Sequence, residues 1–90
     1  MYKNGLALLE SRLWTEEPNA TLLVYVTLLG TADDRRIAVF RSVLDLAARA
    51  RVTTEEAVEA VKYLEAPHEP EGRHIQRIRE GWYIVKGVFE

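Results

Sequence analysis

The sequence from Ser42 to Glu65 reads SVLDLAARARVTTEEAVEAVKYLE and contains two helix start signals. Ser42, with Asp45 three residues later, has the spacing of a helix N-cap. Thr53 and Glu56 have the spacing of a capping box, in which each side chain accepts a hydrogen bond from the backbone N–H group of the other residue. Because only a short turn separates the two helices, they must cross at a steep angle. This stretch therefore predicts a helix-turn-helix.

Apolar residues recur with a helical period in both predicted helices. They are Val43, Leu44, Leu46, Ala47 and Ala50 in the first helix, and Ala57, Val58, Val61 and Leu64 in the second. Residues at these spacings share one helix face, so we expect both stripes to be buried. Arg49 and Arg51 end the first helix, where the helix dipole favours positive charge. Arg51 stands where many helix-turn-helix turns carry glycine, so it must adopt an unusual backbone conformation or reshape the turn.

A third helix and a short strand are predicted on the N-terminal side of this unit. Glu17-Pro18-Asn19 opens the helix, because proline is tolerated in a first turn. The residues from Ala20 to Leu29 are apolar nearly all round, which is typical of a helix in the middle of a core. Gly30 marks its end, and Ile37 to Phe40 is a β-prone run long enough for one strand.

The C-terminal part predicts a loop followed by a β-hairpin. Residues 66–72 contain two prolines and a glycine, which stop the preceding helix. Residues 75–78 and 82–88 are rich in β-branched and aromatic side chains, and Glu80-Gly81 is the predicted two-residue turn between them. The whole pattern predicts a mainly α fold with a small β-hairpin (α+β), a winged helix-turn-helix. It has a three-helix core, a short strand and a C-terminal wing over residues 18–90, preceded by an arm or short helix over residues 1–17.

Length and composition bound the function classes. With 90 residues the chain is long enough for one domain, and the absence of Cys excludes disulfides, Cys-ligated metals and a thiol nucleophile. The longest uninterrupted apolar run, from Leu22 to Val26, is far short of the ~18 residues needed to span a membrane. With a single Lys3 and an interrupting Glu10, the N-terminus makes a poor signal peptide. We therefore expect a soluble, cytoplasmic protein with no membrane partner.

Several short motifs together carry a family resemblance. They are Ser11 and Trp14, Val26-Thr27-Leu28-Leu29, Asp33, Ser42-Val43, Leu46-Ala47, Val52-Thr53-x-Glu55-Glu56-Ala57, Leu64-x-Ala66-Pro67, Glu71-Gly72-Arg73-x-Ile75 and Gly81-Trp82. In order and spacing they resemble the winged-helix domain near the N-terminus of replication-initiation (replisome organiser) proteins of bacteriophages and mobile elements. The resemblance implies binding of double-stranded DNA in phage or mobile-element replication or transcription regulation, in the cytoplasm of a bacterial host. A second copy, or a replication or transcription protein, is the partner that belongs to the alternative function described below.

Three sets of residues are candidates for contact with DNA. The first set flanks the turn and consists of Arg49 and Arg51. The second set lies on the predicted exposed face of the second helix: Thr54, Glu55, Glu59, Lys62 and Tyr63. The third set lies close together on one strand of the hairpin: Arg73, Arg77 and Arg79, together with His74. Arginines on a hairpin suit contact with the phosphate backbone or the minor groove. They can equally form a solvated strand face paired with Glu69, Glu71 and Glu80.

The glutamates of the second helix point to a different partner. Two carboxylates against one ammonium match a duplex poorly, because it carries a phosphate charge every ~1.7 Å of its axis. Glu55 or Glu59 can accept a hydrogen bond from the N4 amino group of cytosine, but Glu55 and Glu56 can also simply stabilise the helix N-terminus. This acidic face and the net charge of -2 favour an alternative function, a winged-helix module for protein–protein interaction.

Neither an enzyme nor a cofactor is expected from the remaining residues. His68 and His74 are the only histidines, and their spacings support no nucleophile–histidine–carboxylate set. His68 with Glu69 or Glu71 would make at most a weak metal site. Trp14 and Trp82 are expected to lie in the core or at its edge.

Overall fold

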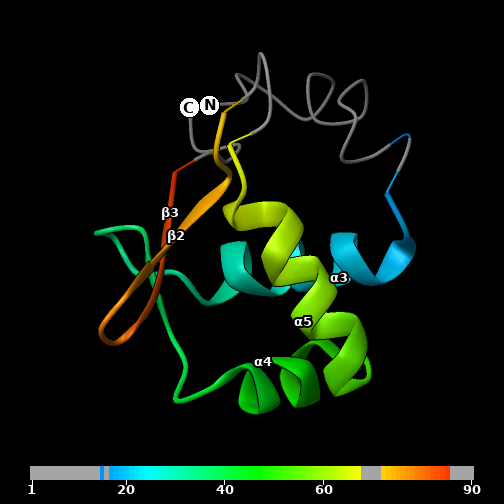
Figure 1. Ribbon diagram of the computed structural model, residues 1–90. Helices are drawn as coiled ribbons and strands as arrows, with labels where there is room; N and C mark the ends of the chain where they lie inside the picture. The colour runs from blue at the N-terminus through cyan, green and yellow to red at the C-terminus, as the bar shows by residue number, and fades with distance from the viewer. Residues whose placement is uncertain (1–14, 16, 68–71, 86–90) are drawn as a thin grey trace.

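Three helices and three strands make up the computed structural model, which describes residues 15, 17–67 and 72–85. The elements are α3 (Asn19–Thr31), β1 (Ile37–Val39), α4 (Val43–Ala50), α5 (Thr54–Glu65), β2 (Ile75–Ile78) and β3 (Gly81–Ile84) (Figure 1). The three helices and the three-stranded antiparallel sheet confirm the predicted α+β class for the described residues. The predicted N-terminal arm lies outside the described residues except for Thr15 and Glu17.

Helix α3 packs one side against the core. The helix opens at Pro18-Asn19, as the sequence predicts, with Pro18 at the N-cap position just before the expected first turn, and Val24, Tyr25 and Leu28 are fully buried. The expectation of a helix buried on all sides is wrong, because Leu23 is 48% and Val26 55% exposed. The other helices and the sheet contact the opposite side of α3, and an apolar sequence alone does not say how many sides will be covered.

Both helix start signals are confirmed. The Ser42 hydroxyl accepts a hydrogen bond from the backbone N–H of Asp45 at 3.3 Å. The Thr53 hydroxyl accepts from the N–H of Glu56 at 3.1 Å, and the Glu56 carboxylate accepts from the N–H of Thr53 at 2.9 Å. Each side chain satisfies an N–H group that has no partner inside its helix, so both boundaries are fixed locally.

The turn between α4 and α5 places an arginine in a backbone conformation that favours glycine. Arg51 has φ 63° and ψ 42°, and its N–H donates to the carbonyl of Ala48 at 3.3 Å. The N–H of Val52 donates to the carbonyl of Ala47 at 3.1 Å, so the last carbonyls of α4 are satisfied by the turn itself. Of the two alternatives predicted for Arg51, the unusual backbone conformation is the one observed.

The buried stripes of α4 and α5 are narrower than predicted. Leu46 and Ala47 of α4 are buried, but Leu44 is 62% exposed. Along α5, Ala60 takes a buried position, and Val58 is 41% exposed. Leu44 lies two positions before the buried Leu46, which is about 200° around the helix, so the two side chains cannot both face the same core.

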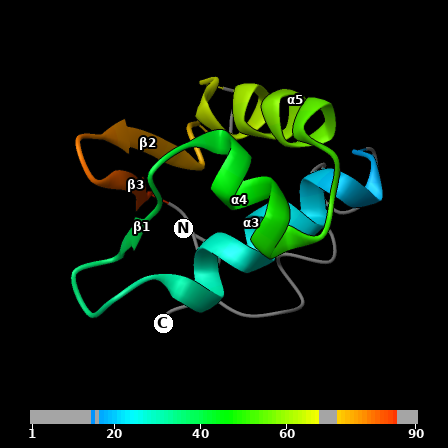
Figure 2. The ribbon, with the colours of Figure 1, turned by 90° about the horizontal axis from the view of Figure 1, so that it is seen from below.

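The sheet has the order β1-β3-β2, so the last strand in sequence lies in the centre. Ala38, Trp82 and Arg77 form one cross-strand row, in which Trp82 is fully buried and confirmed as a core residue. Seen from below, the hairpin of β2 and β3 extends away from the helices (Figure 2). The hairpin therefore forms one edge of the domain.

The hairpin turn is displaced by one residue from its predicted place. Arg79 and Glu80 form the turn, whereas Gly81 is the first residue of β3 and lies opposite both Val39 and Ile78. Gly81 has φ 157°, and a Cβ atom there would collide with the carbonyl oxygen of Ala38. Glycine is required at this position because the backbone of β1 approaches it closely, not because the chain turns there.

A side-chain-stabilised turn leads into β1. The Asp33 carboxylate accepts hydrogen bonds from the N–H groups of Arg35 at 2.8 Å and Ile37 at 3.1 Å. The bond from Ile37 is the main reason that the pKa of Asp33 lies below its ordinary value. Arg36 has φ 67°, and its carbonyl accepts from the N–H of Ile84 at 2.8 Å, which joins the turn to β3.

None of the described helices has the length and apolar character needed to cross a lipid bilayer.

Candidate nucleic-acid interface

Exposed arginines gather around the β2–β3 hairpin. Arg73, Arg77 and Arg79 are exposed, as the sequence predicts. Arg41 is also exposed, and it joins them because the N–H of the preceding Phe40 donates to the carbonyl of Glu80 in the hairpin turn at 3.1 Å. We call Arg41, Arg73, Arg77 and Arg79 the hairpin cluster. Sequence analysis missed Arg41, because only the pairing of two distant segments brings it to the hairpin.

One arginine of the hairpin cluster is held in place by an aromatic ring. Arg77 and Trp82 lie opposite each other in the sheet, and the Arg77 guanidinium carbon is 4.6 Å from the centroid of the indole ring. The Nε1–H of Trp82 donates to the carboxylate of Glu65 at 2.9 Å. This cation–π contact and the hydrogen bond behind it connect the hairpin to the C-terminal end of α5.

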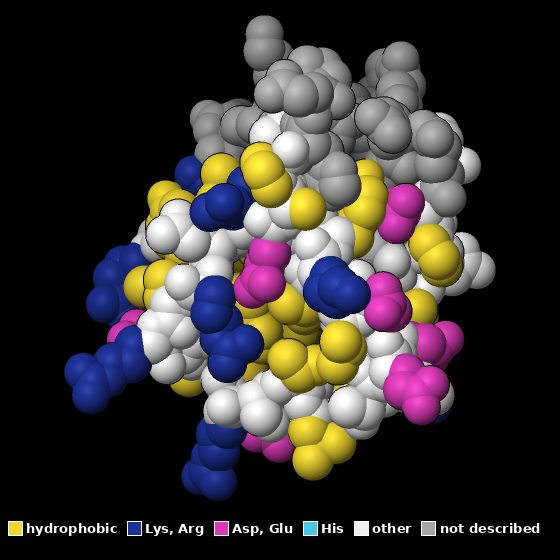
Figure 3. All heavy atoms as spheres, viewed as in Figure 1, with side chains coloured by type: hydrophobic (Ala, Val, Ile, Leu, Met, Phe, Trp, Pro, Cys, Tyr) yellow, Lys and Arg dark blue, Asp and Glu magenta, His cyan; other side chains and the backbone are white. Residues whose placement is uncertain are grey.

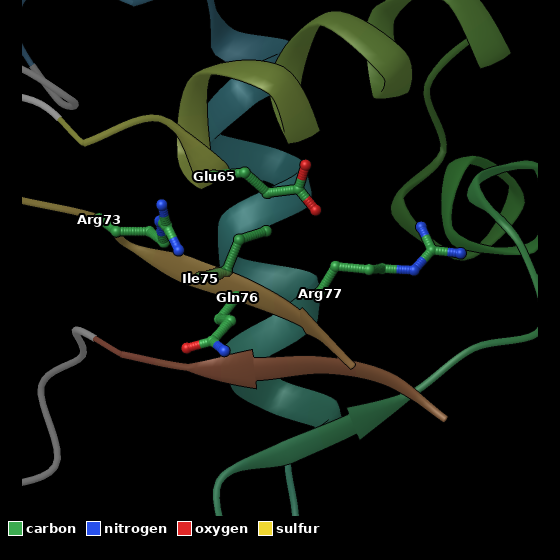
Figure 4. Close-up of a pocket in the computed structure, with 5 residues that line it drawn as sticks. All are labelled: Glu65, Arg73, Ile75, Gln76 and Arg77. Carbon is green, nitrogen blue, oxygen red and sulfur yellow. The ribbon is translucent and has the colours of Figure 1, made fainter. Parts of the chain in front are cut away.

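A pocket of about 360 Å³ lies between the end of α5 and β2. Its lining consists of Glu65, Arg73, Ile75, Gln76 and Arg77. Figure 4 shows Arg73 and Arg77 on the side of β2 that also carries Glu65, with the Gln76 side chain pointing to the other side of the sheet. The two guanidinium groups therefore border the same open space, where a negatively charged group can approach both.

The exposed face of α5 contains most of the residues predicted for it. Thr54, Glu55, Glu59 and Lys62 are exposed. Lys62, the one cation of the helix, has its ammonium nitrogen 3.8 Å from the carboxylate of Glu59. Its charge is thus balanced within the helix, and the remaining charges on this face are carboxylates.

Tyr63 does not belong to that exposed face. It is half-buried, and its ring centroid is 5.9 Å from that of His74. His74 itself is fully buried, with Tyr25 edge-on to it at 5.8 Å. His74 therefore does not share the exposed surface of the hairpin with the arginines, contrary to what the sequence suggested. The backbone N–H of His74 donates to the carbonyl of Leu64 at 2.9 Å, and this bond joins the start of the hairpin to α5.

The arginines of the α4–α5 turn are separate from the hairpin cluster. Arg49 and Arg51 are exposed at the C-terminal end of α4. In both ribbon views this end of α4 points away from the hairpin (Figures 1 and 2). The structure therefore does not bring all the predicted arginines together.

Positive and negative charge occupy different parts of one face. Figure 3 shows dark blue basic side chains mainly over the hairpin and magenta acidic side chains mainly over α5. Helix α5 contains four Glu and one Lys, whereas Glu80 is the one acidic residue between Arg73 and Ile84. A polyanion that approaches this face meets attraction at the hairpin and repulsion at the helix.

The described residues contain no group of three or more His, Asp or Glu side chains placed to hold a metal ion. His68, Glu69 and Glu71 lie outside the described residues, as does Trp14. Comparisons with protein-family models, with curated proteins and with solved structures found no match.

Proposed function

We propose that this chain is a winged-helix domain that binds double-stranded DNA, with the hairpin as its main contact. The order of elements supports the fold assignment, because a helix and a short strand precede two closely spaced helices and a hairpin. The sheet order β1-β3-β2 also supports it, because the short strand that precedes the helix pair joins the hairpin in one sheet. The resemblance to replisome organiser domains favours a role in the replication or regulation of phage or mobile-element DNA.

The hairpin cluster is the observation that carries this proposal. Its arginines are exposed, and within the described part of the chain none of the four takes part in an ion pair. Phosphate contacts in protein–DNA complexes come largely from such arginines and lysines, which position the protein on the duplex. Arginine adds a planar guanidinium group that can bind phosphate oxygens through two hydrogen bonds.

The acidic face of α5 decides how the domain approaches DNA. Glu55, Glu59 and the cap residue Glu56 all lie near the helix N-terminus, the part that a helix-turn-helix normally presents to base edges. Repulsion from phosphate opposes deep insertion of this end. In our proposal the domain therefore binds mainly through its hairpin, and α5 approaches the groove only shallowly.

The test is the salt dependence of DNA affinity in a hairpin variant. Changing Arg73, Arg77 and Arg79 together to Ala should reduce the slope of log affinity against log salt by about 0.9 for each phosphate group that the variant no longer binds. The matched control changes the same three residues to Lys, which keeps the charge, so its slope should stay near that of the wild type. An unchanged slope in the alanine variant would remove the hairpin from the DNA-binding surface.

A protein-interaction module is the second candidate, favoured by the charge and exposed apolar surface of the helix pair. Alongside the four Glu of α5, Val58 and Leu44 are exposed on α5 and α4. These residues suit a partner that is basic and partly apolar. Binding of the purified protein to a random DNA library at two salt concentrations separates the candidates, because only the DNA-binding proposal requires salt-sensitive enrichment.

A further inference from the structure

We infer that Glu65 is a positioning residue for DNA binding, although it carries the same charge as the ligand. Through the Trp82 indole, Glu65 fixes the surface on which Arg77 lies. This inference rests on the proposed function, since it assigns Glu65 a part in presenting one arginine of the hairpin cluster to phosphate.

The first link is the hydrogen bond between Glu65 and Trp82. Glu65 is the last residue of α5, and its carboxylate accepts from Nε1–H of Trp82 at 2.9 Å. The Trp82 side chain is fully buried, so its one donor group needs a protein partner. A shorter side chain at position 65 would remove that partner, and no hydrogen bond from Glu65 would then fix the orientation of the Trp82 ring.

The second link is the contact between Trp82 and Arg77. The Trp82 ring also packs against Phe40, with the ring centroids 6.3 Å apart and the planes tilted by 55°. Arg77 occupies the cross-strand position opposite Trp82, and its guanidinium lies over the indole. Because Glu65 and Phe40 hold the indole ring from two sides, the Arg77 side chain rests on a fixed surface. Arg77 therefore loses less conformational entropy when it binds phosphate.

Glu65 does not neutralise the arginines that surround it. The described residues include no ion pair between Glu65 and Arg73 or Arg77, although all three line the same pocket. Figure 4 shows the Arg77 guanidinium lying apart from the Glu65 carboxylate. The carboxylate is engaged by the indole, and the guanidinium groups stay open to an incoming anion.

Charge and positioning predict different results at position 65. If only charge matters, Glu65→Gln and Glu65→Ala remove the same repulsion and should bind DNA equally. Glutamine keeps an oxygen that can accept from the Trp82 indole, whereas alanine does not. We therefore expect Glu65→Gln to bind DNA at least as tightly as the wild type, and Glu65→Ala to bind several-fold more weakly than Glu65→Gln.

Three further variants test whether the effect is specific to the contact between Glu65 and Trp82. Glu80 is exposed in the hairpin turn, so Glu80→Gln and Glu80→Ala serve as controls and should bind DNA equally. Trp82→Phe keeps an aromatic ring but removes the N–H donor, so the difference between Gln and Ala at position 65 should disappear in that background. Equal affinities of Glu65→Gln and Glu65→Ala in the Trp82 background would overturn the inference.

A measurement on the free protein tests the positioning role of Glu65 independently of DNA binding. The NMR resonance of the Trp82 indole N–H, assigned with Trp82→Phe, should move much more in Glu65→Ala than in Glu65→Gln. An equal shift in both variants would also overturn the positioning role. A wild-type protein without salt-dependent DNA binding would instead overturn the proposed function, whatever the indole resonance shows.

Discussion

Helix α5 and the β2–β3 hairpin lie on one face of the domain, and their charged residues differ in what they do for the fold. Glu56 completes the capping box, Glu59 pairs with Lys62, and Glu65 binds the indole of Trp82. Glu55 lies in the first turn, where the helix dipole favours a carboxylate. The acidity of α5 is therefore largely explained by the stability of the helix and its packing.

The arginines of the hairpin have no comparable explanation. Arg77 lies on Trp82, but for Arg41, Arg73 and Arg79 the described residues provide no ion pair. A long, exposed side chain without an intramolecular partner contributes little to folding. A charged side chain that makes no stabilising contact within the domain is therefore a better candidate for binding a partner than one that does.

The largest expected effect comes from breaking the hairpin itself. Gly81→Ala places a Cβ atom against the carbonyl of Ala38 and within 2.9 Å of the N atom of Phe40, so the strands must separate. We expect a loss of about 3 kcal/mol in the free energy of unfolding. Urea denaturation measures this loss, with Gly30→Ala as the control, because a Cβ at Gly30 has no atom within 4 Å. Equal losses in both variants would contradict the close approach of the strands.

Removing negative charge from α5 tests whether its glutamates oppose DNA binding. Changing Glu55 and Glu59 together to Gln removes two charges that repel phosphate, so nonspecific DNA affinity should rise by about tenfold at low salt, or about 1.4 kcal/mol. Site discrimination should fall if either residue reads a cytosine. In the interaction-module alternative the same change slows association with a basic protein partner and hardly alters DNA affinity. Fluorescence anisotropy with specific and random duplexes distinguishes these results.

The capping box gives a smaller and purely structural effect. Thr53→Ala removes the hydroxyl that accepts from the N–H of Glu56, and it should lower the free energy of unfolding by about 1 kcal/mol. Thr54→Ala is the matched control, since Thr54 is exposed and the neighbouring Thr53 provides the cap. A thermal melt of Thr53→Ala that matches the wild type would be inconsistent with the observed helix start.

The smallest effect concerns the turn before β1, which supports the sheet beneath the hairpin. The N–H of Ile37 lowers the pKa of Asp33 below its ordinary value of 3.8, so the folded state favours the carboxylate. Its stabilising contribution is complete above that ordinary value and is lost as the pH falls through the lower pKa of the folded state. Asp33→Asn keeps an acceptor without the charge, so its stability should depend less on pH below 3.8. Parallel acid titrations followed by circular dichroism would show equal slopes if this assignment is wrong.

The sequence predicted those features that depend on neighbouring residues. The N-cap at Ser42 and the capping box at Thr53 are set by contacts three residues apart, and both are observed. The strand at Ile37 is also found, because a β-branched run is visible without knowledge of its partner. For Arg51 the sequence left two alternatives, an unusual backbone conformation or a reshaped turn, and the structure shows the first.

Features that depend on distant residues could not be predicted. His74 is buried because Tyr25 and Tyr63, from two different helices, meet around it. Arg41 reaches the hairpin only through the pairing of Phe40 with Glu80. The true place of the hairpin turn follows from the approach of β1 to Gly81, which the hairpin sequence alone does not contain. The exposed half of α3 likewise depends on how many elements pack around it.

The strand order has a consequence for how the domain is made. Because β3 lies between β1 and β2, neither outer strand has a partner until residues 81–84 have folded between them. The three helices contact one another without any residue of β3, so they can associate while the sheet is still incomplete. During that interval Ile75 and Ala38, both fully buried in the finished domain, lack the strand that joins them. Arg73 and Arg77 flank Ile75 in the sequence, and charged residues beside an unpaired apolar strand oppose its pairing with a second chain.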